Sequence, residues 1–405
     1  MFDNLLFQSA AKLLEYDIVS NTLPGAVLFC GSESSGKLTA ALETARVLSC
    51  QASPRGKWSC TCPSCLKHKA LVSPNLMLLG PRDCALEINA AAKSFVSSVS
   101  MNDSHVTATR YLFLRSVRKL QNRFNPALWQ DSDKLNKIAA LTSELDEYME
   151  ELDVARELPE LKKIEEDVQK IVELSEKLEG GFLYDSIPVL QIRNLSAWAH
   201  IGAASGTKVI IIEKAERMLE GVRNALLKIL EEPPANTLFI LTTSRKNAVM
   251  PTILSRLRPY NFSSRTVEQE KEIIERVFHD GSALAPSNGG SMLQHYLEGF
   301  LPVRPEAIEK RALEFFDQIF DGKIPDIADL IKNCGKFEPR VLFRIFLSSL
   351  ETRSRQFFGS AQGTQKAMAV SKALRDCYFN VSTYNQSIQA ALEELFLALA
   401  KERSR

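Results

Sequence analysis

The sequence is organised around residues 209–262. This stretch contains, in order, VIII at 209–212, NALLKILEEPP at 224–234, LFIL at 238–241, TTS at 242–244 and ILSRL at 253–257. The two apolar runs are short, and polar residues do not alternate with apolar ones within them. That pattern is typical of strands buried on both faces of a parallel sheet. We therefore expect a strand at each run and an α/β fold.

A helix is expected between the two strands, at residues 218–230, because its apolar residues recur at helical spacing. Pro233 and Pro234 end it. In α/β folds, nucleotide chemistry is found at the carboxyl ends of parallel strands. Glu213 and Thr243 stand at those ends, so we expect them to line one crevice.

The segment NALLKILEEPP and the pair Ser255-Arg256 closely resemble the gamma/tau and delta-prime subunits of the bacterial DNA polymerase III clamp loader, which are AAA+ proteins. The resemblance implies a RecA-like P-loop parallel sheet, a small helical lid and a C-terminal all-α collar. The expected boundaries are 1–262 for the AAA+ domain, with a zinc module at 50–68 and a helical coiled-coil insertion at 85–181, then 263–303 for the lid and 304–405 for the collar.

Composition narrows the class of protein. The 405 residues include 50 basic and 49 acidic ones, so any contact with DNA must come from a local patch. No apolar run is long enough for a membrane span and no signal peptide opens the sequence, so we expect a soluble, cytoplasmic protein with no membrane partner. Four of the eight cysteines lie between Cys50 and Cys65. In such a protein, a cluster predicts a metal rather than disulfides.

A phosphate-binding loop is predicted at 31–39, GSESSGKLT. It is nearly G-x4-G-K-[ST], and it lies between an expected strand at 25–30 and an expected helix at 38–48. Its glycines allow backbone N–H groups to surround a phosphate, and its lysine adds a positive charge. The candidate nucleotide-binding residues are Gly31, Ser34, Ser35, Gly36, Lys37, Leu38 and Thr39, together with Glu213 and Thr243.

One position departs from the P-loop motif. Leu38 stands where a Ser or Thr hydroxyl would bind Mg²⁺. Thr39 cannot replace it, because the next residue of a helix points about 100° away. We expect weak ATP binding here, with the magnesium site in doubt. The alternative is an inherited loop that binds nothing.

The cysteine cluster, Cys50, Cys60, Cys62 and Cys65, predicts a closed structural zinc site. The resembling family carries a similar module, spaced Cys-x8-Cys-x2-Cys-x2-Cys. Cys60 arrives one residue late for that spacing, and His68 is a lower-ranked substitute for it. The alternative to zinc is four reduced thiols in a loop.

Residues 85–181 interrupt the resemblance. Two seams of apolar residues step by three and four within them, at 135–152 and 158–178, with many Glu and Lys residues alongside. We interpret these seams as one antiparallel coiled-coil hairpin. Just upstream, basic residues accumulate near aromatic ones: Arg110, Arg115, Arg118, Lys119 and Arg123. They indicate either a solvated helix face, which we favour, or a contact with DNA phosphates or an acidic partner.

The resemblance also implies a damaged ATPase site. Glu213 stands where an aspartate would help hold Mg²⁺, and Lys214 where a glutamate would position the attacking water. A lysine is a cation and cannot act as that base without a strong perturbation. In the expected lid, Met292 follows Gly290-Ser291 where family members with working sites have a sensor arginine. These departures predict a degenerate ATPase without hydrolysis of its own.

Arg256 matches the arginine finger of the family, which reaches the γ-phosphate held by a neighbouring subunit. A planar, permanently charged guanidinium suits the charge that develops there. The alternative is a surface arginine in a polar loop. After the lid, five helices are expected, at about 306–320, 324–333, 338–357, 361–379 and 387–402, from apolar stripes at helical spacing.

The leading hypothesis is a delta-prime-like subunit of the clamp loader, within the DNA-directed DNA polymerase holoenzyme. It would donate Arg256 to a neighbouring ATPase in a hetero-oligomeric ring. The implied partners are the other clamp-loader AAA+ subunits, the sliding clamp and, through the complex, primer-template DNA. One alternative is a gamma/tau-like ATPase motor. Another is a diverged AAA+ protein whose coiled coil recruits something unrelated to replication.

Overall fold

The computed structural model describes residues 1–82, 84–202, 206–281, 291–384 and 386–403. The chain divides into two compact units, Met1–Tyr296 and Leu297–Arg405. The first unit contains a sheet with helices on both faces. The second contains the helices from residue 305 onward.

The sheet has five strands in the order β2-β3-β4-β1-β5, and each neighbouring pair is parallel. The strands are β1 (Ala26–Gly31), β2 (Leu76–Leu79), β3 (Lys208–Ile212), β4 (Thr237–Thr243) and β5 (Arg258–Phe262). The prediction of a parallel sheet from the runs at 209–212 and 238–241 is confirmed. Those runs are β3 and β4, at the middle of the sheet.

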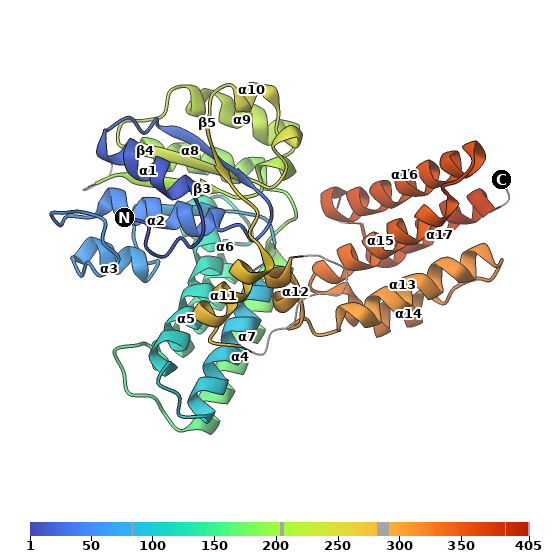
Figure 1. Ribbon diagram of the computed structural model, residues 1–405, viewed down its shortest axis with the longest axis horizontal. Helices are drawn as coiled ribbons and strands as arrows, with labels where there is room; N and C mark the ends of the chain where they lie inside the picture. Colours follow the sequence, from blue (N-terminus) through green and yellow to red (C-terminus); the bar gives the residue numbers. More distant parts are fainter. Residues whose placement is uncertain (83, 203–205, 282–290, 385, 404–405) are drawn as a thin grey trace. The chain divides into compact units, whose positions relative to one another are not determined.

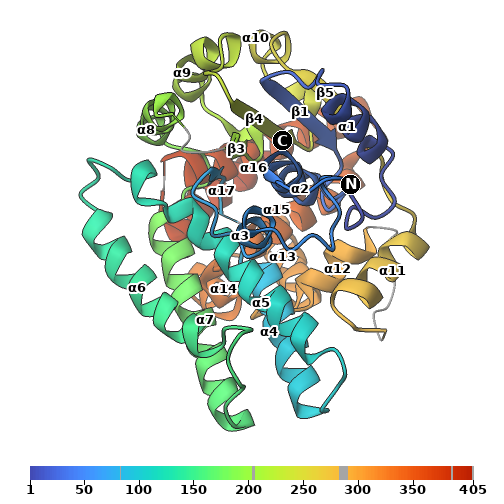
Figure 2. The same ribbon diagram turned by 90° about the vertical axis from the view of Figure 1, so that its left-hand side faces the viewer.

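Each face of the sheet has its own core. Val27 and Phe29 pack on one face with residues of α1 (Ala10–Val19) and α2 (Lys37–Ser49). The residue between them, Leu28, packs on the other face with residues of later helices. Figure 2 shows α1 and α2 on one side of the sheet and α8 and α9 on the other. Because both faces of β1 to β4 are buried, these strands need no polar alternation, whereas the edge strand β5 has exposed residues at Pro259 and Asn261.

Short elements connect the strands of the first unit. They are α3 (Pro63–Lys69), α8 (Val189–His200), η3 (Ala215–Arg217), α9 (Glu220–Glu231), η4 (Lys246–Ala248) and α10 (Pro251–Leu254). The lid region contains α11 (Val267–Val277) and α12 (Met292–Glu298). Thr266 begins α11 with a capping box, because its side chain accepts from the N–H of Gln269 while the Gln269 side chain accepts from the Thr266 N–H. Residues 282–290 of the expected lid, including Gly290, lie outside the described residues.

The insertion forms two helical hairpins, not the single hairpin expected from the sequence. The helices are α4 (Ala85–Ser100), α5 (Val106–Gln121), α6 (Leu135–Glu151) and α7 (Leu161–Phe182), with single turns η1 (Asn122–Phe124) and η2 (Pro126–Leu128) between the pairs. In addition, α7 packs against both α6 and α4, so the two hairpins share a core. Figure 1 shows these helices extending away from the sheet. The prediction missed the first hairpin because its apolar residues lie in the Ala- and Ser-rich helix α4 and the Arg-rich helix α5.

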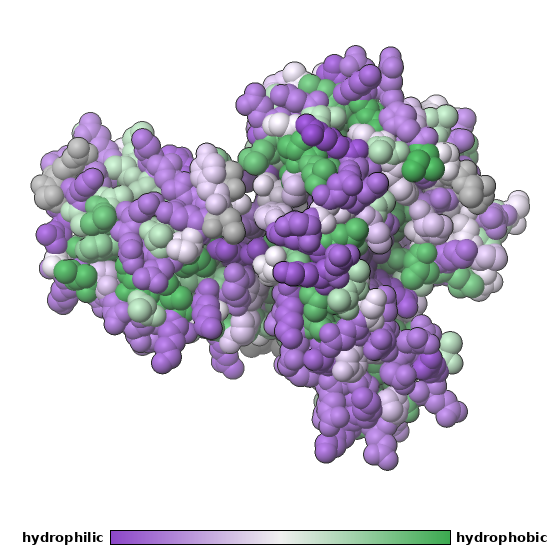
Figure 3. Space-filling model, turned by 180° about the vertical axis from the view of Figure 1, so that it is seen from behind, coloured by the Kyte–Doolittle hydropathy of each residue, from purple (hydrophilic) through white to green (hydrophobic). Residues whose placement is uncertain are grey.

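The two predicted seams are buried where α6 meets α7. Ile138, Leu145 and Met149 lie on one side, and Ile164 and Ile171 on the other. The charged residues beside the seams remain outside. Figure 3 shows that hydrophilic residues cover the far end of the insertion. Pro159 precedes α7 and does not interrupt it, as a proline near a helix start should.

The second unit is a bundle of helices with an aromatic core. Its elements are α13 (Pro305–Phe320), α14 (Ile327–Asn333), η5 (Gly335–Phe337), α15 (Val341–Ser354), η6 (Arg355–Phe357), α16 (Ala361–Tyr384) and α17 (Ile388–Arg403). The ring of Phe346 lies 5.6 Å from that of Phe315 and 5.3 Å from that of Phe337. Among the described residues, none of the helices is both long and apolar enough to cross a membrane.

Candidate functional site

The loop predicted to bind phosphate lies between β1, which ends at Gly31, and α2, which begins at Lys37. Gly36 has a φ of 91°, in the left-handed region that favours glycine. A Cβ atom on Gly31 would lie 2.5 Å from the carbonyl oxygen of Phe262. The shape of the loop therefore requires both glycines.

Lys37 bends back over its own loop. Its Nζ donates to the carbonyl oxygens of Gly31, at 2.7 Å, and Ser32, and to the Ser35 hydroxyl at 3.2 Å. Burial lowers the pKa of Lys37 to about 8, and the nearby carboxylates of Glu33 and Glu216 only partly offset this effect. The amino group of Lys37 is therefore held against the carbonyl and hydroxyl oxygens of its own loop.

The two residues after Lys37 provide no hydroxyl at the metal position. The Leu38 side chain packs against the core formed with α1 and α2. Thr39 is the next residue on the helix and faces a different direction. The structure thus places an alkyl group where the motif needs a ligand for Mg²⁺.

Glu213 follows β3 as expected, but its carboxylate pairs with Arg123 of the insertion. The Arg123 guanidinium contacts Glu213 Oε2, and the two side chains are only 7% and 13% exposed. A Cβ atom on Gly80, after β2, would lie 2.9 Å from the same oxygen. The Glu213 side chain therefore lies beside the end of β2, at the edge of the sheet away from β1.

Glu216 is an acidic residue near the loop that the sequence analysis missed. Its Oε1 accepts from the N–H of Ser244, at 3.2 Å, and from the Ser244 hydroxyl, at 2.6 Å. Burial acts to raise the pKa of Glu216, but hydrogen bonds from Ser244 and Thr243 outweigh burial and lower it. This ionised carboxylate acts on Lys37. Its position three residues after Glu213 was the only signal in the sequence.

Thr243 lies beside the phosphate-binding loop, because it pairs with Cys30 near the end of β1. It is buried, and its hydroxyl accepts from the N–H of Arg245 at 3.1 Å. Lys214 has a φ of 53°, in the left-handed region, and its N–H donates to the Thr242 hydroxyl at 3.4 Å. Of the predicted nucleotide residues, the structure brings Thr243 to the loop and turns Glu213 away from it.

The cysteine cluster is assembled in space. The Sγ atoms of Cys50, Cys60, Cys62 and Cys65 all lie within 4.8 Å of one another, and those of Cys50 and Cys60 are 3.8 Å apart. Four sulfurs at 2.3 Å from a tetrahedral zinc ion would be about 3.8 Å apart, so the cluster fits that ion. Cys60 joins the group despite its late position in the sequence.

His68 is buried near the cluster but is not part of it. Both of its ring nitrogens have no hydrogen-bond partner in the described part of the chain. Burial, and then the charges of Arg46 and Arg115, lower the pKa of His68 to about 4. The ring is therefore a neutral, packed group, and the geometry favours Cys60 as the fourth ligand.

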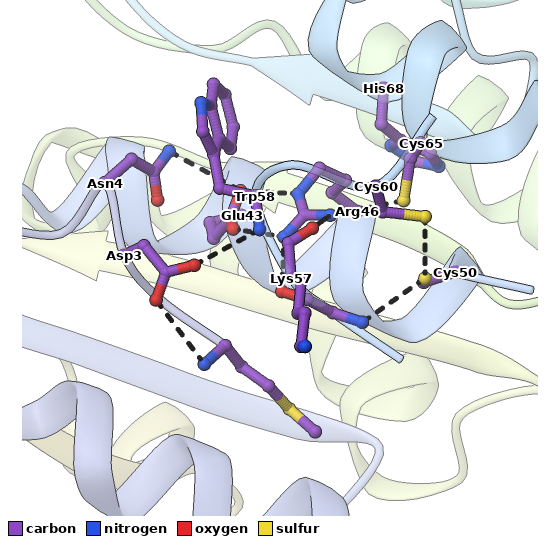
Figure 4. Close-up of polar contacts among 12 residues, drawn as sticks. Asp3, Asn4, Glu43, Arg46, Cys50, Lys57, Trp58, Cys60, Cys65 and His68 are labelled. Carbon is purple, nitrogen blue, oxygen red and sulfur yellow. Dashed lines mark hydrogen bonds and ion pairs between the residues drawn. The ribbon is translucent and has the colours of Figure 1, made fainter. Parts of the chain in front are cut away.

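Polar groups around the cluster orient the thiols (Figure 4). Arg46 donates to Cys65 Sγ at 3.2 Å, and the N–H of Gly56 donates to Cys50 Sγ at 3.2 Å. The Arg46 guanidinium also pairs with Glu43 and lies 5.5 Å from the centre of the Trp58 ring. Such outer groups fix metal ligands and tune their charge.

The basic residues of α5 bind other parts of the same chain. Arg115 donates to the carbonyl oxygen of Lys69, and Arg118 to that of Ala70 at 3.3 Å, both at the end of α3. Arg110 is buried and donates to the carbonyl oxygen of Leu152 at 2.8 Å. The favoured interpretation as a solvated helix face was therefore wrong for these arginines. They dock α5 onto the end of α3 and onto the second hairpin.

Arg256 lies between α10 and β5, next to the amino-terminal ends of the strands. The predicted phosphate-binding loop lies at their carboxyl ends. It donates to the carbonyl oxygen of Thr252 at 2.7 Å and pairs with Glu231 at 3.0 Å. Since β5 runs parallel to β1, its first residue lies near the start of β1, whereas the loop follows the end of β1. At about 3.3 Å per residue, a strand of this length separates the two ends by about 13 Å.

These features define a class: an α/β protein with a five-stranded parallel sheet and, between β1 and α2, a loop that nearly matches the P-loop motif. A family described as "DNA polymerase III, delta subunit" matches residues 7–128 and 141–266. These residues are more than half of the chain, so the chain belongs to this family.

Curated relatives agree with that family. The chain is 32% identical to DNA polymerase III subunit delta' of Haemophilus influenzae over 29% of this chain and 38% of that protein. It is 39% identical to the delta' subunit of Pseudomonas aeruginosa over 17% of this chain and 22% of that protein. It is 31% identical to the tau subunit of Salmonella typhimurium over 30% of this chain and 16% of that protein. The chain thus matches less than half the length of each relative.

Proposed function

We propose that this protein is a delta-prime-type subunit of the DNA polymerase III clamp loader, which works in the cytoplasm and donates Arg256 to a neighbouring subunit. Its own P-loop binds a nucleotide weakly and does not hydrolyse it. The partners are the other AAA+ subunits of the ring, the sliding clamp and, through the complex, primer-template DNA. The alternative function, which the experiment below is designed to exclude, is a gamma/tau-type ATPase motor subunit.

The position of Arg256 carries this proposal. It lies at the amino-terminal ends of the strands, whereas the subunit's own phosphate-binding loop lies at their carboxyl ends. A guanidinium there cannot reach a phosphate bound to Lys37, but it is free to meet one held by a neighbour. The Glu231 partner is 60% exposed, so an incoming phosphate competes for the guanidinium in solvent at low cost.

The lack of hydrolysis follows from the residues around the loop. Leu38 has no hydroxyl, Glu213 is paired with Arg123, and Lys214 stands in place of the base. None of these three positions can therefore serve as the metal ligand or as the base that activates water.

We assign the cysteine cluster to a structural zinc ion, held by the four thiolates with no open coordination position. Zinc would fix the loop 50–65 against α2 and α5. The helical second unit is proposed as the collar through which clamp-loader subunits pack into a ring.

The test is ATP turnover by the purified subunit, alone and mixed with its clamp-loader partners. We expect the lone subunit to be inert. In the mixture, Arg256→Ala should lower turnover by tenfold or more, because arginine fingers contribute about 10³–10⁵ in rate. Arg193→Ala is the matched control, since Arg193 is exposed on α8.

Two results would overturn the proposal. If Arg256→Ala leaves turnover by the mixture unchanged, Arg256 is not a finger. If the lone subunit hydrolyses ATP and Lys37→Ala abolishes that activity, the protein is a motor of the gamma/tau type.

A further inference from the structure

A divalent metal, which P-loop folds of this class use with nucleotide, does not fit the residues present. The hydroxyl ligand is replaced by Leu38, whose partly buried side chain packs against the core. The acidic ligand, Glu213, is engaged by a cation that belongs to the chain itself. The site does more than lack metal ligands, because the Arg123 guanidinium is paired with the one carboxylate that would bind the metal.

The ion pair is enclosed. Arg123 is 7% exposed and Glu213 is 13% exposed. A second nitrogen of the Arg123 guanidinium contacts Cys84 Sγ. Gly80 makes room for the pair, because a Cβ atom there would lie 2.9 Å from Glu213 Oε2 and 3.1 Å from Arg123 Nε. A buried charge that loses its partner is costly, so the two side chains stay together.

The backbone of Arg123 is also held in place. Its carbonyl oxygen accepts from Trp129 Nε1 at 2.9 Å, and the Trp129 ring stacks on Phe124 with 5.7 Å between centroids. The preceding residue, Asn122, donates to the carbonyl oxygen of Leu71 at 2.9 Å. Arg123 therefore reaches Glu213 from a fixed turn that is anchored on both sides.

The pair also sets the direction of the carboxylate. In the sheet order β2-β3-β4-β1-β5, the phosphate-binding loop follows β1, two strands away from β3 on one side. Glu213 is drawn to the other side, beside Gly80 at the end of β2. The acids near Lys37 are Glu33 and Glu216, and the hydroxyl and N–H of Ser244 occupy Oε1 of Glu216.

We propose that Arg123 keeps Glu213 away from metal, so that the P-loop takes a nucleoside di- or triphosphate without a divalent cation. The inference rests on the proposed nucleotide site and adds how that site recognises its ligand. Lys37 and the N–H groups of the loop supply the positive side of the interaction. Arg123 acts on the carboxylate and is a positioning residue.

The test is the dissociation constant for a fluorescent ADP analogue, measured in excess Mg²⁺ and in EDTA. The quantity compared is the ratio of the dissociation constant in EDTA to that in Mg²⁺. For the wild type this ratio should be within twofold of one. Arg123→Met keeps most of the apolar stem but removes the charge that holds Glu213. In that variant we expect Mg²⁺ to tighten binding by fivefold or more, and the double variant Arg123→Met/Glu213→Gln should return the ratio to within twofold.

A matched control is Lys137→Met, which removes another cation of the insertion from an exposed position on α6. It should keep the wild-type ratio. If Arg123→Met does not fold, Glu213→Gln decides, because its ratio should equal that of the wild type.

Three results would overturn the inference: a wild type that needs Mg²⁺ to bind, an Arg123→Met variant that folds but keeps the wild-type ratio, or a wild type that binds no nucleotide at all. Each is independent of Arg256, whose role is measured by turnover in the mixture. The finger role and this inference can therefore fail separately, whereas a wild type that binds no nucleotide would also remove the weak binding stated in the proposed function.

Discussion

The guanidinium of Arg46 donates a hydrogen bond of 3.2 Å to the Sγ atom of Cys65. The same group pairs with Glu43, and both side chains of that pair are 1% exposed. A thiolate held by a buried cation carries less excess negative charge, so a cluster of four thiolates can close around one zinc ion. The contact thus links α2, which begins at the phosphate-binding loop, to the proposed metal site.

The first prediction follows from this contact. Arg46→Lys keeps the charge but cannot hold Cys65, Glu43 and the backbone together as a planar fork does. We expect the zinc affinity to fall about 10–100-fold, as for other groups that orient metal ligands. Competition with a chromogenic chelator measures it. Lys67→Met, at an exposed position on α3, should leave the affinity unchanged, and an unchanged affinity in Arg46→Lys would show that the contact is only structural.

The second prediction concerns the fourth ligand. Cys60→Ser should purify with much less zinc than the wild type, because the Sγ atom of Cys60 lies within the cluster. His68→Gln should retain its zinc, since neither ring nitrogen of His68 is in the group. Metal content by mass spectrometry, with circular dichroism as a check on folding, distinguishes them. If His68→Gln loses its zinc while Cys60→Ser retains it, His68 rather than Cys60 is the fourth ligand.

The third prediction separates Arg256 from its partner Glu231. The ion pair at 3.0 Å is largely in solvent and contributes less than about 1 kcal/mol to stability. A finger must leave Glu231 to reach a neighbour's phosphate. Glu231→Gln should therefore keep or raise the ATP turnover of the mixed complex, while Arg256→Ala lowers it. If the two variants lose the same activity, Glu231 orients the finger rather than competing for it.

The fourth prediction is a pH dependence at the contact between the insertion and the lid region. The ring of His279 stacks on that of His105 with 4.0 Å between centroids, and Ser94 donates to the carbonyl oxygen of Phe278 at 2.5 Å. Burial, and then the neighbouring His105, lower the pKa of His279, although Asp103 acts in the opposite direction.

The sign of the effect follows from that lowered pKa. The unfolded chain binds a proton at His279 more readily than the folded chain does, so stability is full above the unfolded pKa of about 6.5 and is lost as the pH falls. Urea unfolding should show a lower free energy at pH 5.5 than at pH 7.5. His279→Phe keeps a stacked ring and should reduce that difference. His200→Phe, at an exposed position on α8, should not.

Much of the fold could be predicted because it depends on local pattern. The unalternating runs at 209–212 and 238–241 predicted central strands of a parallel sheet, and they form β3 and β4. The stripes after residue 305 predicted helices close to those observed. For α14 the start was three residues early, because Asp326 caps the helix by accepting from the N–H of Asp329.

The candidate site was less predictable. Leu38 and Lys214 could be judged from the motif alone, since each changes the chemistry of one position. Glu216 could not be distinguished from other acids near β3, and its role depends on Ser244, 28 residues later. Cys60 looked misplaced by spacing, because the spacing in the sequence does not show how the loop from Cys50 bends.

Periodicity was therefore enough to predict the parallel sheet and the buried seams of the insertion, because each depends on residues a few positions apart. The use made of Glu213 depends on Arg123, which is 90 residues away in the sequence. The same is true of the arginines of α5, which look like a basic patch in the sequence and act as helix and loop anchors in the structure. Such pairs can be identified only in the folded chain, because a charged side chain that becomes buried must pair with whichever polar group the fold places beside it.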